Sequence, residues 1–205
     1  EGKMKIAIEG MDGVGKTTVA KKLAERNNFR YVGNAIHQLF GITDKESEFY
    51  KYFQSKEDEI FLHSGNDILR GWLCSLGNIY TATQDGDIVV DRHLLSNFQQ
   101  NGTKENARIF QTLVELIGAP DISIIVYASP KVRLNRIYNR NKNDKDLSDK
   151  SIRIDEYKKM IKFAQKFNMP YFIIDTEEKS ISEIVEEIEQ KINLRNKGEL
   201  GNEER

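Results

Sequence analysis

Residues 10–17 read Gly-Met-Asp-Gly-Val-Gly-Lys-Thr and match the phosphate-binding pattern G-x-x-x-x-G-K-[ST]. Glycines in such a loop let successive backbone N–H groups turn toward a polyphosphate. The lysine, here Lys16, reaches the β and γ oxygens, and the hydroxyl of the last residue, here Thr17, holds Mg²⁺. The pattern therefore predicts a nucleoside triphosphate site formed by Gly10, Met11, Asp12, Gly13, Val14, Gly15, Lys16, Thr17 and Thr18.

The residues on either side of this loop fit the same interpretation. Residues 4–9 form a short apolar run of strand type, and the residues from Lys16 onward begin an amphipathic helix. The N-terminus of a helix adds partial positive charge, which favours a bound phosphate. Strand, loop and helix in this order are typical of phosphate binding, and a plain glycine-rich turn is the weaker alternative.

Asp91 and Arg92 are a second group suited to phosphate chemistry. They directly follow Ile88-Val89-Val90, a short buried run of strand type. Because open α/β sheets bind ligands at the carboxyl ends of their strands, Asp91 is predicted to lie near Mg²⁺ together with Thr17. Arg92 can hold an acceptor phosphate through two parallel hydrogen bonds. The alternative for this pair is an ordinary surface ion pair.

A third group is a series of basic residues that recur at spacings of three and four and continue into a polar segment. They are Arg133, Arg136, Arg140, Lys142 and Lys145. The spacing places the arginines on one face of a predicted helix. A basic helix that leads into a polar segment predicts a mobile lid over about residues 136–150, with Arg136 and Arg140 as its catalytic cations. A solvated charged face is the alternative.

Strands and helices must bring these groups together, and the sequence alternates between the two. Apolar runs predict strands at residues 4–9, 29–32, 88–90, 122–127 and 171–174. Helical periodicity is expected at residues 16–27, 56–80, 107–117, from 130 onward, 152–167 and 181–194, whereas residues 37–57 show no clean period. Short buried strands separated by helices predict an α/β fold of three layers, a five-stranded parallel sheet with helices on both faces.

Within the expected helix at 56–80, the apolar residues fall close to one face. They are Ile60, Ile68, Trp72, Leu76 and Ile79. Cys74 lies among them and is the only cysteine of the chain, so no internal disulfide can form. A buried packing role is expected for Cys74, and a lone thiol suits a reducing compartment.

The 205 residues are enough for one α/β domain, which is expected to span residues 4–194. Residues 1–3 are expected to be a remnant ahead of a native start at Met4, and residues 195–205 a frayed tail. With 31 basic and 32 acidic residues, the net charge of −1 indicates neither a nucleic acid polymer nor a membrane surface as partner. No apolar stretch reaches the roughly 18 residues that span a bilayer, so a cytoplasmic location is expected. The three histidines show no metal-ligand spacing.

Several segments of the chain resemble thymidylate kinases. Residues 9–18 are similar to the E-G-x-D-G-x-G-K-T-T loop of that family, and Asp91-Arg92-His93 followed by Ser96-Asn97 resembles its D-R-[YH]-x-x-S-[NS] segment. Residues 85–90 and 129–137 resemble the stretches before that segment and before the lid. The resemblance implies a P-loop kinase that uses Mg²⁺ and ATP. In that family a lid arginine assists transfer when the loop lacks one, as it does here with Val14. Its members are often dimers, so a homodimer is a candidate assembly.

The acceptor side departs from the family's pattern. Residues 31–36 show no R-E-P-G segment, and Asn66 stands about where these kinases present an arginine to the base. Residues 99–102 read Gln-Gln-Asn-Gly where Ala-Tyr-Gln-Gly is expected. Trp72 is a residue that can stack on a base, with a core position as the alternative. The candidate substrate-binding residues are Asn66, Trp72, Arg92, Ser96 and Asn97.

The favoured interpretation is a kinase that transfers the γ-phosphate of ATP to a nucleoside monophosphate. A deoxynucleoside kinase stays open, although such enzymes carry a carboxylate base near the end of the second strand, where this chain has Asn34. Asp91 could still act as that base. Residues 141–144 fit the N-K-x-D guanine motif of GTPase switches, but they follow a helical run and not a buried strand. A nucleotide-binding protein without transfer activity is the last alternative.

Overall fold

A parallel sheet forms the centre of the protein. The computed structural model describes residues 3–142, 147 and 156–199, and within them the strand order is β2-β3-β1-β4-β5. The strands are β1 (Lys5–Glu9), β2 (Arg30–Val32), β3 (Ile88–Asp91), β4 (Ile122–Tyr127) and β5 (Tyr171–Asp175). Every neighbouring pair is parallel, which confirms the predicted five-stranded parallel sheet.

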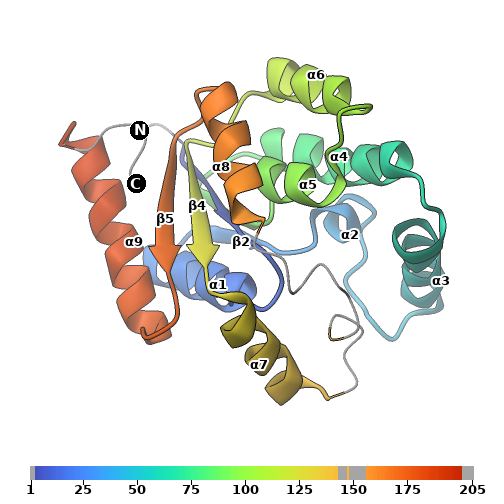
Figure 1. Cartoon of the computed structure of the whole chain (residues 1–205), viewed down its shortest axis with the longest axis horizontal. Helices are drawn as coiled ribbons and strands as arrows, with labels where there is room; N and C mark the ends of the chain where they lie inside the picture. The colour runs from blue at the N-terminus through green and yellow to red at the C-terminus, as the bar shows by residue number, and fades with distance from the viewer. Residues whose placement is uncertain (1–2, 143–146, 148–155, 200–205) are drawn as a thin grey trace.

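Helices cover both faces of this sheet. On one face α1 packs against α9, and on the other α5 packs against α8, with α4 and α6 further out (Figure 1). The helices among the described residues are α1 (Lys16–Asn27), α2 (Ala35–Leu39), α3 (Glu48–Asp58), the π-helix η1 (Glu59–His63), α4 (Asp67–Ala82), α5 (Leu94–Asn101), α6 (Ala107–Ile117), α7 (Pro130–Arg140), α8 (Tyr157–Lys166) and α9 (Ile181–Asn196). The predicted three-layer α/β architecture is therefore confirmed.

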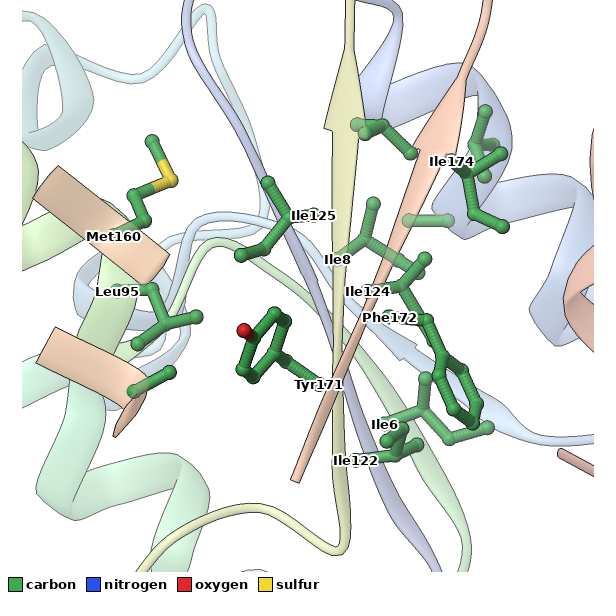
Figure 2. Packing of buried hydrophobic residues seen from close by; sticks show 14 of the residues in the cluster. Ile6, Ile8, Leu95, Ile122, Ile124, Ile125, Met160, Tyr171, Phe172 and Ile174 are labelled. Carbon is green, nitrogen blue, oxygen red and sulfur yellow. The ribbon is translucent and has the colours of Figure 1, made fainter. Parts of the chain in front are cut away.

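The hydrophobic core has two halves, one on each face of the sheet (Figure 2). Ile8, Ile124 and Phe172 are paired across neighbouring strands, so their side chains point to the same face. Tyr171 points to the opposite face, toward Leu95 of α5. Because both faces are covered, the strands are apolar along their length and do not alternate with polar residues.

The segment between β2 and α4 differs from its prediction. Residues 37–57 contain α2 and α3, and the expected helix at 56–80 is interrupted. After α3 the chain forms η1, Gly65 takes a φ of 58°, and the Asn66 side chain caps α4 by accepting from the backbone N–H of Leu69 at 2.9 Å. A capping side chain together with a left-handed glycine separates the two helices.

The apolar stripe expected on the 56–80 helix does not face the core. Ile68, Trp72 and Leu76 of α4 are 53%, 46% and 41% exposed. The buried side of α4 instead carries small and polar residues, because α2 approaches closely there: a Cβ on Gly77 would lie 3.2 Å from the Cβ of Ala35. Of the five residues expected on one face, these three share a face of α4, and that face is turned outward. Ile79 instead packs against the core, and Ile60 belongs to η1.

The two ends of the chain and the expected lid are described in part. The last helix, α9, runs to Asn196, two residues beyond its predicted end, and residues 200–205 lie outside the described chain. Of the expected lid, α7 and residues 141, 142 and 147 are described. Among the described residues, none of the helices is long and apolar enough to cross a membrane. The domain limits of 4–194 stay a prediction.

Two leucines of α6 test how much this packing contributes to stability. Leu113 is 2% exposed and Leu116 is 73% exposed. We expect Leu113→Ala to lower the free energy of unfolding by about 2–5 kcal/mol, because it leaves a cavity in the core. Leu116→Ala, the same change one turn further on, should alter it by less than about 0.5 kcal/mol. Denaturant unfolding measures both, and equal losses would contradict this account of the core.

Candidate active site

The phosphate-binding loop connects β1 to the N-terminus of α1, as predicted. Gly13 and Gly15 have φ values of 81° and 100°, in the left-handed region that favours glycine. A Cβ on Gly13 would lie 2.8 Å from the carbonyl oxygen of Arg133, so this position is closed by α7. A Cβ on Gly15 would meet no atom within 4 Å. The loop is therefore open where α1 begins, at the helix end that favours an anion.

The amino group of Lys16 is buried inside this loop. Its Nζ donates to the carbonyl oxygen of Met11 at 2.6 Å and lies 4.0 Å from Oδ1 of Asp12. Burial lowers the pKa of Lys16 to about 7, and Arg92 acts in the same direction, whereas neighbouring carboxylates oppose it. A polyphosphate in the loop would supply the negative charge that favours the protonated amine.

Thr17 and Asp91 meet at the junction of the loop and β3. Oγ1 of Thr17 donates to Oδ2 of Asp91 at 2.5 Å, and the phenol of Tyr31 in β2 donates to the same oxygen at 3.3 Å. Burial, with help from Asp91, raises the pKa of Tyr31, so its phenol stays a donor. Oδ1 of Asp91 is buried and has no hydrogen-bond partner among the described residues. A hydroxyl beside a carboxylate oxygen without a partner fits Mg²⁺, which prefers oxygen ligands.

Arg92 follows β3 with a φ of 73°, a strained value for a residue other than glycine. Its Nη2 donates to Oδ1 of Asp12, and its Nη1 is buried without a partner among the described residues. Burial opposes the charge of Asp12, but Arg92 and Lys16 outweigh it and lower the pKa of its carboxyl to about 2. Arg92 therefore holds Asp12 with one nitrogen and has a second one available for another anion.

Glu9 at the end of β1 fixes the backbone around Arg92. Its buried carboxylate accepts from the backbone N–H groups of His93, Leu95 and Ser96, at 3.0, 3.1 and 3.0 Å. These groups belong to the N-terminus of α5, where a carboxylate is favoured by the helix dipole. In the sequence, Glu9 stands out only as the first residue of the segment that resembles the thymidylate kinase loop. The available signal was an acidic residue at the end of a buried strand.

A cavity of about 610 Å³ adjoins these residues. Thr17, Asp91 and Arg92 line it on the side of the loop, and further lining residues come from α2, α3, η1, α4 and α5. Its volume lies within the roughly 300–1,000 Å³ that is usual for sites of small ligands. This cavity is therefore the candidate site of the acceptor, next to the site of the donor phosphates.

Ser96 and Asn97, both predicted to bind the acceptor, line this cavity. Oγ of Ser96 accepts from the backbone N–H of Gly10 at 3.4 Å. Nδ2 of Asn97 donates to Oδ1 of Asn78 in α4 at 2.8 Å. Both side chains thus also connect α5 to its neighbours.

Asn66 and Trp72, the other predicted acceptor residues, do not line the cavity. Asn66 uses its side chain to cap α4, and Trp72 lies on the outward face of that helix. Phe61 of the π-helix η1 lines the cavity instead. π-Helical turns are frequent at functional sites.

The arginines of α7 contact the back of the phosphate-binding loop. Nε of Arg133, a buried residue, donates to the carbonyl oxygen of Asp12 at 2.8 Å. Nη1 of Arg136 donates to the carbonyl oxygen of Val14 at 3.1 Å, and its Nη2 donates to that of Thr176, after β5, at 2.6 Å. Arg136 is therefore brought to the loop, although toward its backbone. Arg140 is the exposed last residue of α7, and Lys145 lies outside the described residues.

Known proteins with similar sequences are nucleotide kinases, as the phosphate-binding loop and the adjoining cavity suggest. A family model described as an AAA domain matches residues 6–159. A probable thymidylate kinase of Archaeoglobus fulgidus is 33% identical over 149 residues, which cover 68% of this chain and 71% of that protein. The chain belongs to the thymidylate kinase family. A second member, a probable thymidylate kinase of Methanococcus maripaludis strain C6, is 27% identical over 188 residues, or 89% of this chain and 92% of that protein.

Solved structures show that this member of the thymidylate kinase family shares its fold with kinases of two kinds. Thymidylate kinase from Ehrlichia chaffeensis has a TM-score of 0.59 at 16% identity, with 94% of this chain and 100% of that chain covered. Deoxyadenosine kinase from M. mycoides, solved with dCMP and dCDP, has a TM-score of 0.60 at 21% identity, with 93% and 99% covered. The fold alone therefore leaves the acceptor open.

The guanine motif considered at residues 141–144 has no strand before it in this family member. Asn141 directly follows the last residue of α7, and residues 143 and 144 lie outside the described chain. In a GTPase this motif should follow a buried strand. Its position here supports the view that the match is accidental.

Cys74 provides a chemical probe of the cavity, which it lines as the only cysteine of the chain. Burial raises the pKa of its thiol to about 11. At pH 8 the thiolate fraction is then about 0.1%, against about a quarter for a free cysteine, so we expect alkylation by iodoacetamide to be about 250-fold slower than that of glutathione. The rate should rise with pH up to about 11. Mass spectrometry of the alkylated protein measures it, and a rate like that of glutathione at pH 8 would contradict the burial of this thiol.

Proposed function

We propose that the protein transfers the γ-phosphate of ATP to the phosphate group of a nucleoside monophosphate. The observation that carries this proposal is the guanidinium of Arg92, whose buried Nη1 has no partner among the described residues although it lines the cavity beside Asp91. A buried cation with an unused donor is suited to an anion, and an acceptor that already carries a phosphate supplies one. The products are ADP and a nucleoside diphosphate.

On the donor side, Lys16 and the N–H groups of residues 13–18 hold the β and γ phosphates in this proposal. Thr17 and Asp91 would hold Mg²⁺, which neutralises charge on the phosphates when it is bound. Lys16 lies close to the loop backbone, and its pKa of about 7 allows a bound polyphosphate to draw a proton onto it. Transfer of this type depends on position and charge more than on covalent chemistry of the protein.

On the acceptor side, Arg92 orients the phosphate that receives the γ-phosphoryl group, and Ser96 and Asn97 form part of the cavity wall. Arg136 keeps the loop in place through the carbonyl oxygens of Val14 and Thr176. Arg140, four residues further along α7, is the proposed cation for the transferring phosphoryl group. The loop itself carries Val14 and no arginine, so this charge must come from another element.

A nucleoside acceptor is the second candidate, because the fold is shared with a deoxyadenosine kinase. A nucleoside kinase needs a carboxylate that removes the proton of a sugar hydroxyl. Asn34 stands after β2, and its Oδ1 accepts from the backbone N–H of His37 at 3.1 Å, so it caps α2. Asp91 accepts from Thr17 and Tyr31. The capping role of Asn34 favours the monophosphate acceptor, because it leaves no carboxylate at the end of β2.

Removal of Lys16 tests the donor site. We expect Lys16→Met to lower kcat for every accepted substrate by at least about 100-fold, because the charge on the transferring group loses its main partner. Lys22→Met, the same change six residues further along α1 where Lys22 pairs with Glu25, should leave kcat within about twofold. ADP release in the presence of Mg²⁺ measures both. Substantial transfer by Lys16→Met would rule out this assignment.

A panel of nucleosides and nucleoside monophosphates tests the acceptor. We expect ADP release to be stimulated by at least one monophosphate and not by the matching nucleoside. Arg92→Lys should raise KM for that monophosphate by about 10-fold or more, because a lysine cannot form the two parallel bonds of an arginine. Stimulation by nucleosides alone would favour the second candidate, and stimulation by none would favour a protein without transfer activity.

We further propose a cytoplasmic homodimer. The exposed apolar residues Ile68, Trp72 and Leu76 recur every four positions along α4, and a twofold axis would place this stripe against its own copy. The lone thiol of Cys74 suits the cytoplasm.

We expect Trp72→Glu to yield a monomer in light scattering, because a charge would be buried in the interface, while Tyr138→Glu on α7, which is also exposed, leaves the dimer intact. A wild-type monomer at all concentrations would refute the dimer.

A further inference from the structure

Two polar side chains of the acceptor cavity have no role in the mechanism above. They are His37 of α2 and Glu57 of α3, which are 9% and 7% exposed and both line the cavity. Nε2 of His37 donates to Oε2 of Glu57 at 2.6 Å. We call them the His37–Glu57 pair. Twenty residues separate them in the sequence, so the fold brings them together.

The imidazole of this pair is held firmly. The rings of Tyr50 and Phe53 in α3 stand edge-on to it, each with its centroid 5.5 Å away, at 87° and 88°. Asn34 accepts from the backbone N–H of His37 and fixes the start of α2. His37 therefore has a set orientation, and its bond to Glu57 sets the orientation of the carboxylate.

Glu57 retains most of its capacity to accept hydrogen bonds. A carboxylate has two oxygens with about four lone-pair sites, and among the described residues His37 is the only hydrogen-bond partner of Glu57. To bury a carboxylate with so few partners costs stability, and replacing such a pair by apolar residues is often neutral or favourable. A ligand that donates a hydrogen bond to Glu57 would offset the cost of burying this carboxylate.

The charges around the cavity favour one orientation of a bound acceptor nucleotide. Arg92 and Lys21 line the cavity as cations on the side of the loop, where Asp91 is the neighbouring anion. On the other side Glu57 of α3 is a buried anion, and the exposed Lys45, between α2 and α3, is a further cation of the lining. The phosphate of a nucleotide is attracted to Arg92 and repelled by Glu57. The part of the nucleotide that can approach Glu57 is then the nucleoside, which offers hydroxyl and N–H donors.

We propose that Glu57, oriented by His37, accepts a hydrogen bond from a hydroxyl or amino group of the acceptor nucleoside and so determines which acceptors are phosphorylated. The inference rests on the proposed function for the identity of the acceptor. The chemistry that Glu57 recognises is a hydrogen-bond donor at the end of the acceptor away from its phosphate. Both the sugar hydroxyl and the base can provide one.

The test compares Glu57→Gln with Glu59→Gln. In Glu57→Gln the amide oxygen can keep the hydrogen bond from His37. The amide NH₂ group then faces the hydroxyl or amino group of the nucleoside, and two hydrogen-bond donors cannot pair. We expect KM for the acceptor to rise about 10- to 100-fold while KM for ATP stays within about twofold. Glu59 is exposed and paired with Lys56, so Glu59→Gln should change neither KM.

Analogues of the accepted monophosphate then distinguish the two sources of the donor. If Glu57 binds the sugar, the wild type should discriminate about 10- to 100-fold against the 3′-deoxy analogue, and Glu57→Gln should lose that preference. If Glu57 binds the base, the same loss should appear between bases with and without an exocyclic amino group. Either result supports the inference. If Glu57→Gln changes neither ratio and leaves the acceptor KM as in the wild type, the inference is overturned.

Measurements of acceptor binding in the absence of ATP test the role of Glu57 independently of the proposed kinase activity. Calorimetric titration with nucleosides and their monophosphates compares the wild type with Glu57→Gln whether or not transfer occurs. If the wild type transfers to no monophosphate, the proposed function fails, and the inference still stands or falls on the change in Kd. If Glu57→Gln does not fold, Glu57→Asp keeps the charge but withdraws the carboxylate. Glu57→Asp should then raise the acceptor KM or Kd in the same way, and an unchanged value overturns the inference.

Discussion

The carboxylate of Glu9 joins the two halves of the site. Glu9 ends β1 and is followed directly by the phosphate-binding loop, and it accepts three backbone hydrogen bonds from the start of α5. Arg92 lies immediately before those bonded groups, in a left-handed conformation that the chain would not adopt unaided. One buried side chain therefore fixes the positions of both the phosphate-binding loop, the proposed donor site, and Arg92, the proposed contact of the acceptor. Because the loop and the end of β3 are held in this way, Thr17 and Asp91 lie within hydrogen-bond distance between the two halves.

The donor half of the site could be predicted because its signals are local. The loop at residues 10–17 is read from consecutive residue types, and Asp91 and Arg92 are found by counting from the end of an apolar run. The same runs predict the strands, because a parallel strand covered on both faces is apolar throughout. The strand order β2-β3-β1-β4-β5 comes from the structure, because several orders of parallel strands are compatible with the same alternation of strands and helices.

The acceptor half could not be predicted in the same way, because it depends on contacts between distant segments. Asn66 is chemically able either to bind a base or to cap a helix, and only the break between η1 and α4 decides for the cap. The stripe containing Trp72 has the right period for a core helix, yet α2 packs on the polar side of α4 and turns the stripe outward. His37 and Glu57 lie twenty residues apart on helices that the sequence did not resolve.

The path of α9 has a practical consequence for work on this protein. The functional residues lie at the carboxyl ends of β1 and β3, toward which the strand arrows in Figure 1 point. β1 begins with Lys5 at the opposite, amino end of the strands, and α9, which follows β5, ends at Asn196, which lines one cavity together with Met4. Labels attached at Met4 or Asn196 would therefore lie away from the candidate nucleotide site. Immobilised or labelled forms can be made without disturbing the groups that carry the chemistry.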